Sequence, residues 1–338
     1  MEKLVTFCVP SYNSEEYLFH ALDSLIPGGD DIEVLIIDDG SKDGTLEIAK
    51  DYEKRYPAIF KAVHQENKGH GGAINTALSL AKGKYFMVVD SDDWVSAKGL
   101  ISLLDCIKKT TVPDLIILPY MYRHSYDSEE GRLIRYNMFI KPGVICSWNK
   151  VKRFDASRNL TLHSAVYKLS VLKEAKVVLP EHCFYEDNYF IYAPLPYVKK
   201  LIYLDAPLYK YLLGREGQSM QTANLVKRSE NLTRVARLAF NSTDLRALKK
   251  TNKRLYRLMK HQLIMMVASP LLYISLKDKE ECKKEKAEFI SSMKQDNPKQ
   301  YRMLRRHSYV YFPSCNNSFG SASAKFMLWA VRKYGMID

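Results

Sequence analysis

Hydrophobic residues in the first 120 positions of this chain follow two alternating patterns. Apolar, strand-forming runs at residues 4–9, 32–39, 60–66, 84–90 and 114–120 predict buried strands. Between these runs, apolar residues recur at helical spacing within residues 13–26, 45–56, 73–83 and 99–109. This alternation predicts an α/β fold with a mostly parallel sheet and helices on both of its faces.

Polar segments follow three of the predicted strands, at residues 10–13, 38–41 and 90–93. Ligands of open parallel sheets bind outside the carboxyl ends of the strands, so we expect these segments to line one crevice. The last segment holds three carboxylates, Asp90, Asp92 and Asp93, within four positions. Carboxylates this close repel one another unless a cation lies between them. The segment therefore indicates either a Mg²⁺ or Mn²⁺ site or a solvated turn.

The pattern changes after residue 120. It predicts a tyrosine-rich hairpin at residues 122–136, helices at 163–175 and 184–195, and a strand–turn–strand unit at 200–213. From about residue 224, helical segments rich in Lys and Arg follow, at 224–240 and 244–269. We therefore expect two domains, an α/β domain at residues 1–222 and a basic, mainly helical region at 223–338.

The positive charge of the chain is concentrated in its last third. The whole chain has a net charge of +13, and residues 221–338 hold 24 Lys and Arg against 9 Asp and Glu. A basic region of this kind favours an anionic partner, either a lipid surface or nucleic acid. Solvated helix faces or a contact between copies of the chain would also explain it.

Other features of the composition indicate a cytoplasmic protein. The sequence has no run of 18 apolar residues, so we expect no membrane-spanning helix. The first residues also lack the pattern of a signal peptide. The six cysteines form no CxxC pair, which is typical of a reduced protein without a structural zinc site.

Six segments together resemble family-2 glycosyltransferases of the GT-A fold. They are residues 9–13 (VPSYN), 36–45 (IIDDGSKDGT), 66–78 (ENKGHGGAINTAL), 88–94 (VVDSDDW), 184–190 (FYEDNYF) and 209–219 (YKYLLGREGQS). The resemblance covers about the first 220 residues. The last third resembles the variable tails of bacterial polysaccharide-assembly members, although no motif there is specific. The resemblance implies a nucleotide-sugar donor, a divalent metal (Mn²⁺ or Mg²⁺) and transfer with inversion at the anomeric carbon.

This resemblance assigns roles in donor binding to residues of the strand ends. Asp92 is the expected metal ligand, since a cation on the pyrophosphate neutralises the departing diphosphate. Asp90 faces the ribose or a metal-bound water. Asp39 accepts a hydrogen bond from a pyrimidine N–H, which favours uracil, or else belongs only to a turn. The remaining expected contacts of the nucleotide and pyrophosphate are Pro10, Tyr12, Asn13, Lys68, Gly69, Ser91, Arg215, Gln218 and Ser219.

Transfer with inversion needs one base that takes the proton from the acceptor hydroxyl. The motif at residues 184–190 assigns this role to Asp187, with Glu186 orienting the acceptor, although the two roles could be exchanged. Trp148, His163 and Tyr185 lie in the region that meets the donor sugar or the acceptor, and His163 also reads as a core histidine. His70 reads equally well as a surface histidine and receives no role.

The expected activity is transfer of a hexose or N-acetylhexosamine from a UDP-linked donor to a hydroxyl of a saccharide, with a lipid-linked acceptor. The process would be capsule, exopolysaccharide or cell-wall glycan synthesis, on the inner face of the cell membrane and held there by the basic region. One alternative is a non-enzymatic protein that binds nucleic acid or an anionic surface, but no nucleic-acid-binding motif is present. Another is a nucleotidyltransferase, which would need a basic glycine-rich loop where this chain has the acidic residues 10–16.

Overall fold

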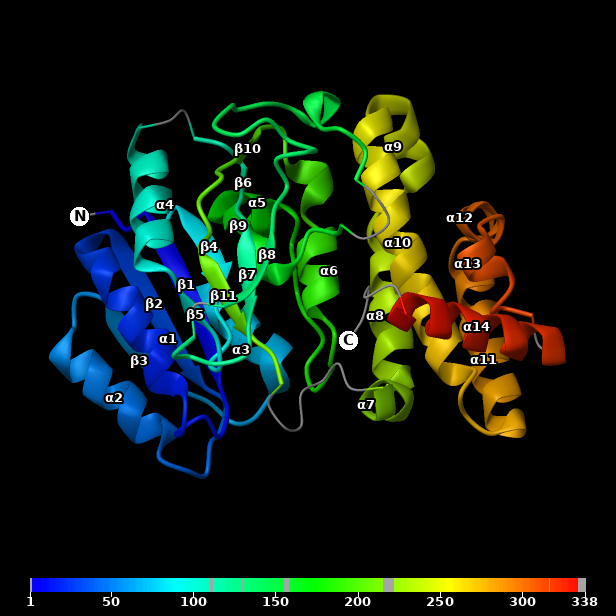
Figure 1. Cartoon of the computed structure of the whole chain (residues 1–338), viewed down its shortest axis with the longest axis horizontal. Coiled ribbons are helices and arrows are strands. Elements are labelled where there is room, and N and C mark those ends of the chain that lie inside the picture. The colour runs from blue at the N-terminus through cyan, green and yellow to red at the C-terminus, as the bar shows by residue number, and fades with distance from the viewer. Residues whose placement is uncertain are drawn as a thin grey trace. The chain divides into compact units, whose positions relative to one another are not determined.

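The computed structural model describes residues 2–109, 112–128, 130–154, 158–214, 222–315 and 317–333. The chain divides into two compact units, coloured from blue to green and from yellow to red in Figure 1. The first unit comprises Met1–Lys152 and Leu160–Glu216, and the second comprises Arg153–Asn159 and Gly217–Asp338. The division falls a few residues before the boundary expected at residue 222, and the transfer of residues 153–159 to the second unit was not predicted.

A seven-stranded sheet forms the centre of the first unit, in the order β10-β6-β9-β4-β1-β2-β3. Its strands are β1 (Val5–Ser11), β2 (Ile32–Asp38), β3 (Phe60–His64), β4 (Tyr85–Val88), β6 (Leu115–Ile117), β9 (Ala165–Lys168) and β10 (Leu201–Tyr203). Every neighbouring pair is parallel except the two that involve β9. The prediction of a mostly parallel α/β sheet is confirmed, and β1, β2 and β4 are fully buried, as their continuous apolar runs require.

The helices of this unit are α1 (Leu18–Leu25), α2 (Thr45–Arg55), α3 (Gly69–Leu80), α4 (Ala97–Lys109), α5 (Leu169–Glu174) and α6 (Asp187–Tyr192). The strand order reverses its direction at β1, and crossovers between parallel strands are right-handed. The crossovers through α1 and α2 therefore lie on one face of the sheet and the crossover through α3 on the other (Figure 1). In α4, Leu100, Leu103, Leu104 and Ile107 are buried at helical spacing, and each contributes about 1.5–3 kcal/mol.

The sequence interpretation was wrong for residues 163–175, which do not form one helix. A single 3₁₀ turn (Leu162–Ser164) leads into strand β9, and only the following residues form α5. The strand exists because Val166 and Tyr167 pair with β6 on one side while Tyr167 and Lys168 pair with β4 on the other. As β9 is antiparallel to both neighbours, its first residue lies at the edge where β4 and β6 end. The turn before β9 therefore reaches the edge of the sheet at which ligands bind.

A second sheet has the order β5-β11-β7-β8. Its strands are β5 (Trp94–Val95), β7 (Tyr120–Arg123), β8 (Gly131–Ile134) and β11 (Tyr209–Leu212). The pairing of β7 with β8 confirms the predicted hairpin, and β10 and β11 confirm the predicted strand–turn–strand unit. Because β5 directly follows the acidic segment and pairs with β11, this sheet brings residues near 210 beside Asp93.

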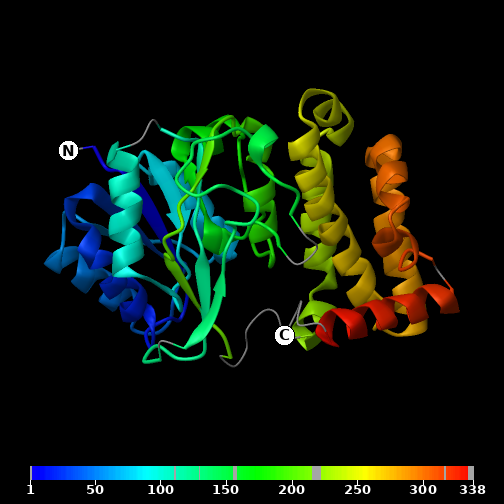
Figure 2. The same ribbon diagram turned by 45° about the horizontal axis from the view of Figure 1, so that its top comes forward.

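The second unit is helical in its described part. Its helices are α7 (Thr222–Lys227), α8 (Ser229–Ser242), α9 (Leu245–Thr251), α10 (Lys253–Ile274), α11 (Lys279–Asp296), α12 (Pro298–Arg305), α13 (Ser308–Tyr311) and α14 (Ser318–Lys333). The basic segment at 244–269 forms two helices because Asn252 leaves the helical backbone, and its side chain accepts a hydrogen bond from the Leu255 N–H at 3.0 Å. α14 runs across α10, which it contacts (Figure 2). Within the described residues, every helix is too short or too polar to cross a membrane.

Candidate active site

The loops after β1, β2 and β4 are joined by hydrogen bonds at the carboxyl edge of the sheet. Ser14 Oγ lies 2.9 Å from Ser91 Oγ, which joins the first loop to the acidic segment. The Asn13 N–H donates to Ser41 Oγ at 3.0 Å, and Asn13 Oδ1 accepts from the Lys42 N–H at 2.9 Å. Pro10 is buried in β1, whereas the Tyr12 side chain is 48% exposed. The three polar segments therefore meet at one edge, as the strand pattern predicted.

Asp39 holds the turn from which α3 starts. Its Oδ1 accepts hydrogen bonds from Gln65 Nε2 at 2.6 Å and the Lys68 N–H at 2.8 Å, and its Oδ2 accepts from the Gly69 N–H at 2.8 Å. Gly69 has a φ of 75°, and a Cβ there would lie 3.0 Å from the His182 backbone nitrogen, so the turn requires glycine. Asp39 is buried and most of its acceptor capacity is used internally, while Lys68 is exposed. Its expected contact with a pyrimidine stays a prediction beside this structural role.

Replacing Asp39 with Ala is expected to lower the free energy of unfolding by about 1–2 kcal/mol, because three part-buried donors lose a charged acceptor. Urea unfolding measures this change. Asp51→Ala is the matched control, since Asp51 forms only an exposed pair with Arg55 and its loss should cost less than about 1 kcal/mol. Unchanged stability of the Asp39 variant would contradict the structural role.

His70 joins two acidic elements of the site. Its Nδ1 lies 2.6 Å from Glu186 Oε1, and its Nε2 lies 3.0 Å from Asp90 Oδ1. Burial lowers the pKa of His70, but the hydrogen bonds to Asp90 and Glu186 outweigh it and hold the pKa well above its usual value. A protonated imidazole donates to both carboxylates at once. The sequence interpretation left His70 without a role. Its position at the start of a helix near the strand ends was a signal that it lies in the site.

Glu186 and Asp187 occupy different environments although they are adjacent. Glu186 is 2% exposed and bonded to His70, whereas Asp187 is the half-buried first residue of α6. Burial and the neighbouring charge of Glu186 raise the pKa of Asp187 to about 7. Tyr185, just before them, has a φ of 69°, a strained conformation that sets the direction of the chain into α6. Asp187 is therefore the carboxylate that can take up a proton near neutral pH.

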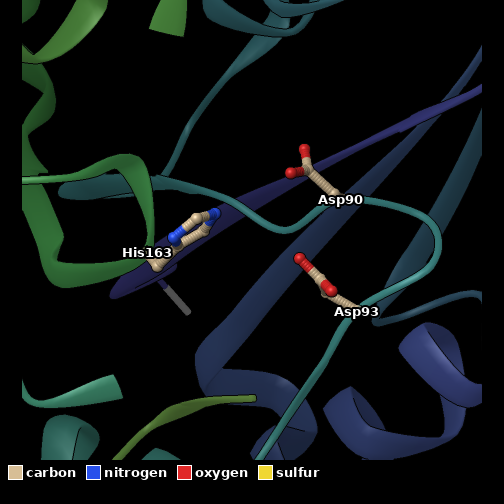
Figure 3. A group of neighbouring side chains, drawn as sticks. All are labelled: Asp90, Asp93 and His163. Atoms are coloured by element: carbon tan, nitrogen blue, oxygen red, sulfur yellow. The ribbon is translucent and has the colours of Figure 1, made fainter. Parts of the chain in front are cut away.

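Asp90, Asp93 and His163 form a group that could hold a cation. One ligand atom of each lies within 4.8 Å of the others, and Figure 3 shows the Asp93 carboxylate and the His163 ring pointing toward a common space beside Asp90. Asp93 Oδ2 accepts from the Tyr209 hydroxyl at 2.6 Å, and Asp93 Oδ1 accepts from the Leu212 N–H at 2.8 Å. Tyr209 in turn accepts from the Asp90 N–H at 3.1 Å.

The chemistry of this group fits a divalent cation. Burial and the charges of Asp92 and Asp90 raise the pKa of Asp93 well above its usual value, which a cation between the carboxylates would reverse. His163 Nδ1 is buried with no hydrogen-bond partner. Burial lowers the pKa of His163 to about 4, so its ring is neutral and has a free lone pair at pH 7. Two carboxylates and one imidazole suit Mn²⁺ or a similar ion.

The other predicted residues have different placements. Asp92 is not part of the group, and its carbonyl oxygen accepts from the Tyr126 hydroxyl at 2.9 Å, so its role as metal ligand stays a prediction. Trp148 is buried and its Nε1–H donates to the Val198 carbonyl at 2.8 Å, so its ring packs in the interior, and the expected sugar contact stays a prediction. His163 is surrounded by the rings of Tyr120, Tyr209 and Tyr211. The candidates outside the described residues are Arg215, Gln218 and Ser219.

Comparisons with known proteins agree with this fold. A poly(ribitol-phosphate) β-glucosyltransferase of Bacillus spizizenii is 29% identical over 65% of this chain, and the match spans 34% of that relative. The putative glycosyltransferase EpsH of Bacillus subtilis is 27% identical over 74% of this chain and 70% of its own length. The chain thus spans about a third of the first relative and most of the second.

Two solved structures share the predicted GT-A fold. Residues 1–349 of S. aureus TarS, in complex with UDP-GlcNAc, match with a TM-score of 0.59 at 21% identity, over 90% of each chain. The mannosyltransferase PcManGT of Pyrobaculum calidifontis, in complex with GDP-Man and Mn²⁺, matches with a TM-score of 0.53 at 15% identity, over 98% of this chain and 88% of that one. The family model described as glycosyl transferase family 2 matches residues 6–174, half of the chain. The chain therefore belongs to glycosyl transferase family 2.

Proposed function

We propose that this glycosyltransferase is metal-dependent and inverting, and that it moves a hexose or N-acetylhexosamine from a UDP-linked donor to a hydroxyl of a saccharide acceptor. The observation that carries the proposal is the placement of Asp187 at the start of α6, where its pKa of about 7 suits a general base. The preceding residue, Glu186, is bonded to His70, which also contacts Asp90; we call these two contacts the His70 bridge. The bridge connects this element to Asp90 and the candidate cation group.

In this mechanism, Asp187 takes the proton of the acceptor hydroxyl while that oxygen forms a bond to the anomeric carbon. The bond from the anomeric carbon to the phosphate oxygen breaks, and its electron pair leaves with the diphosphate. Asp90, Asp93 and His163 would hold the divalent cation, which when bound supplies positive charge to the departing diphosphate. One displacement inverts the anomeric carbon, so no second nucleophile is needed.

Glu186 and His70 keep the base in place. Glu186 is the residue directly before α6, and its carboxylate is held by His70 Nδ1. This contact fixes the chain at the point where Asp187 enters the helix. Because Glu186 is already bonded and buried, it is less available to an acceptor hydroxyl than Asp187, which supports Asp187 as the base.

The nature of the donor and acceptor is supported by the relatives. The TarS structure contains UDP-GlcNAc, and one relative is named for glucosyl transfer to poly(ribitol-phosphate). They favour a UDP-linked donor and an acceptor in cell-surface glycan synthesis, whether capsule, exopolysaccharide or cell wall. The lipid-linked acceptor, the cytoplasmic location and the contact with a membrane stay predictions from the sequence.

A nucleotide-sugar screen by thermal unfolding and donor hydrolysis tests this proposal. We expect one of UDP-glucose, UDP-galactose and UDP-GlcNAc, with Mn²⁺, to raise the unfolding temperature of the wild type. Ligand at 100 times its Kd stabilises by about 2.7 kcal/mol. GDP-mannose should have a smaller effect.

His163→Ala should remove the Mn²⁺-dependent part of the stabilisation, because it removes the unpartnered nitrogen of the cation group. His124→Ala, at an exposed histidine of the hairpin, is the matched control and should behave as the wild type. Asp92→Ala separates the two views of the metal site, since only a direct ligand role predicts the same loss as His163→Ala. No stabilisation of the wild type by any UDP-sugar with Mn²⁺ would overturn the proposal.

A further inference from the structure

The second unit contains a pocket of about 960 Å³ whose walls come from α9, α10 and α12. Seven of its lining side chains are cations and only one is an acid. α9 contributes three of the cations, α10 one and the α12 segment three: Arg246, Lys249, Lys250, Lys253, Lys299, Arg302 and Arg306. All seven are exposed, and the contacts of two of them are local: Arg302 Nε donates to the Pro298 carbonyl at 3.3 Å, and Lys249 Nζ lies over the Tyr256 ring.

Carboxylates of the described residues do not balance the positive charge of this pocket. None of the seven cations forms an ion pair with any described residue. The one acid, Asp244, is engaged by the start of α9, where its Oδ1 accepts from the Arg246 N–H at 2.8 Å and the Ala247 N–H at 3.3 Å. Some cations elsewhere in the same unit are paired, as in Arg237 with Asp296 at 2.6 Å. The pocket therefore gathers seven cations of three helical segments around one hollow with a single carboxylate.

The positive field of the pocket reaches neighbouring groups. Burial and the charge of Lys249 lower the pKa of Lys260. Seven unpaired cations around one hollow repel one another, and a bound anion would relieve this repulsion. Arg and Lys are the side chains that bind phosphate oxygens most strongly, Arg in a bidentate manner. The volume is at the upper end of ligand pockets, which are about 300–1,000 Å³, so it has room for more than one phosphate.

The walls do not favour a bilayer. Among the described residues that line the pocket, only Ala247 and Met303 have aliphatic side chains. The large exposed apolar side chains of the last helix, Phe319, Phe326 and Trp329, belong to α14 and do not line it. A bilayer presents a flat surface with an apolar interior, and proteins bind it with apolar side chains. A hollow lined by charged groups is better suited to an anionic chain that can enter it.

The walls do not favour nucleic acid either. Single strands bind on exposed aromatic rings on which successive bases stack. Tyr256 is the one aromatic residue in the described lining of the pocket. Its side chain is half-buried, and Lys249 Nζ lies over its ring at 5.8 Å. A phosphate-bearing chain without bases is the better match.

We propose that this pocket binds a phosphodiester segment of a soluble polyol- or sugar-phosphate chain, and so gives the enzyme a second point of contact with a phosphate-bearing acceptor. Only the identification of the bound chain as an acceptor rests on the proposed function. The binding itself rests on the seven unpaired cations and the hollow that they line.

Binding of lipid-free poly(glycerol phosphate) to the full chain, measured by calorimetry at two salt concentrations, tests the proposal. We expect Lys249→Gln/Lys250→Gln to weaken binding at least tenfold and to flatten the salt dependence, because two phosphate contacts are lost. Lys279→Gln/Lys284→Gln is the matched control, since it removes the same charge from exposed positions of α11 outside the pocket. The control should change binding less than twofold.

Three outcomes would overturn the proposal: equal weakening by both double variants, tighter binding of phosphatidylglycerol vesicles, or tighter binding of single-stranded DNA with the same number of phosphates. Stabilisation by UDP-sugar and Mn²⁺ is measured on the same variants and should be unchanged. If polymer binding fails while this stabilisation persists, only the pocket assignment is wrong. If the polymer binds but no UDP-sugar does, the proposed function is wrong and the pocket assignment holds.

Discussion

Asp187→Asn is expected to reduce the rate of sugar transfer by about 10²- to 10⁴-fold, while the affinity for the nucleotide sugar stays near that of the wild type. The amide keeps the shape of the side chain but cannot accept the proton of the acceptor hydroxyl. Transfer is measured as product formed from a saturating donor, and donor affinity is measured by thermal unfolding. Wild-type rates of transfer in the variant would remove Asp187 from the mechanism.

The pH dependence of the wild type follows from the same residue. A base works only when it is deprotonated, and the pKa of Asp187 is raised to about 7 by burial and by Glu186. The rate should therefore increase as the pH rises through about 7 and then level off. Glu186→Gln distinguishes the two carboxylates. It should shift this rise to lower pH, because the charge of Glu186 helps to raise the pKa of Asp187, and it should lower the rate less than Asp187→Asn does. The reverse order of the two rates would make Glu186 the base.

His70→Ala is expected to have the second largest effect, on stability and on transfer together. The substitution leaves the Glu186 carboxylate, which is 3% exposed, without its imidazole partner. Removing one partner of a buried pair costs about 3–5 kcal/mol, and the 36% exposure of the His70 side chain brings our expectation to about 2–3 kcal/mol. Transfer should fall because both Asp90 and the start of α6 lose a fixed contact. His70→Gln, which can still donate to one carboxylate, should restore part of both.

The sign of the pH effect identifies the contribution of His70 to stability. Its pKa is raised in the folded protein, because the hydrogen bonds to Asp90 and Glu186 outweigh the lowering effect of burial. A group of this kind stabilises fully below its unfolded pKa of about 6.5, and the stabilisation is lost as the pH rises through the folded value. The difference in unfolding free energy between wild type and His70→Gln should therefore shrink from pH 6 to pH 9. A difference that grows over this range would contradict the bridge.

Much of the fold, and the meeting of the polar segments at one edge of the sheet, could be predicted from the sequence. Strands β1, β2 and β4 have unbroken apolar runs because both of their faces are buried, and parallel strands must end at a common edge. The polar segments that follow them therefore had to meet. Asp187 and Glu186 were found through a family motif, and α6 does begin at that motif.

The cation group and its bridge could not be predicted in the same way. Residues 163–175 are apolar at a spacing that suits a helix, and only the ladders with Leu115–Ile117 on one side and Tyr85–Phe86 on the other make Ala165–Lys168 a strand. This one antiparallel strand carries His163 to the ligand-binding edge. Asp93, which reads as one acid of a turn, is joined to Tyr209 by a hydrogen bond across 116 positions of the chain.

The amino-acid sequence by itself determined the parallel sheet, the edge at which the polar segments meet and the family, because hydrophobic period and sequence motif are local properties of the chain. The tertiary structure alone decided that His70 joins Glu186 to Asp90, that His163 and Asp93 lie beside Asp90, and that the cations of three helices surround one pocket. These relations depend on which distant segments pair and on where their side chains point, and one-dimensional spacing carries no information about either.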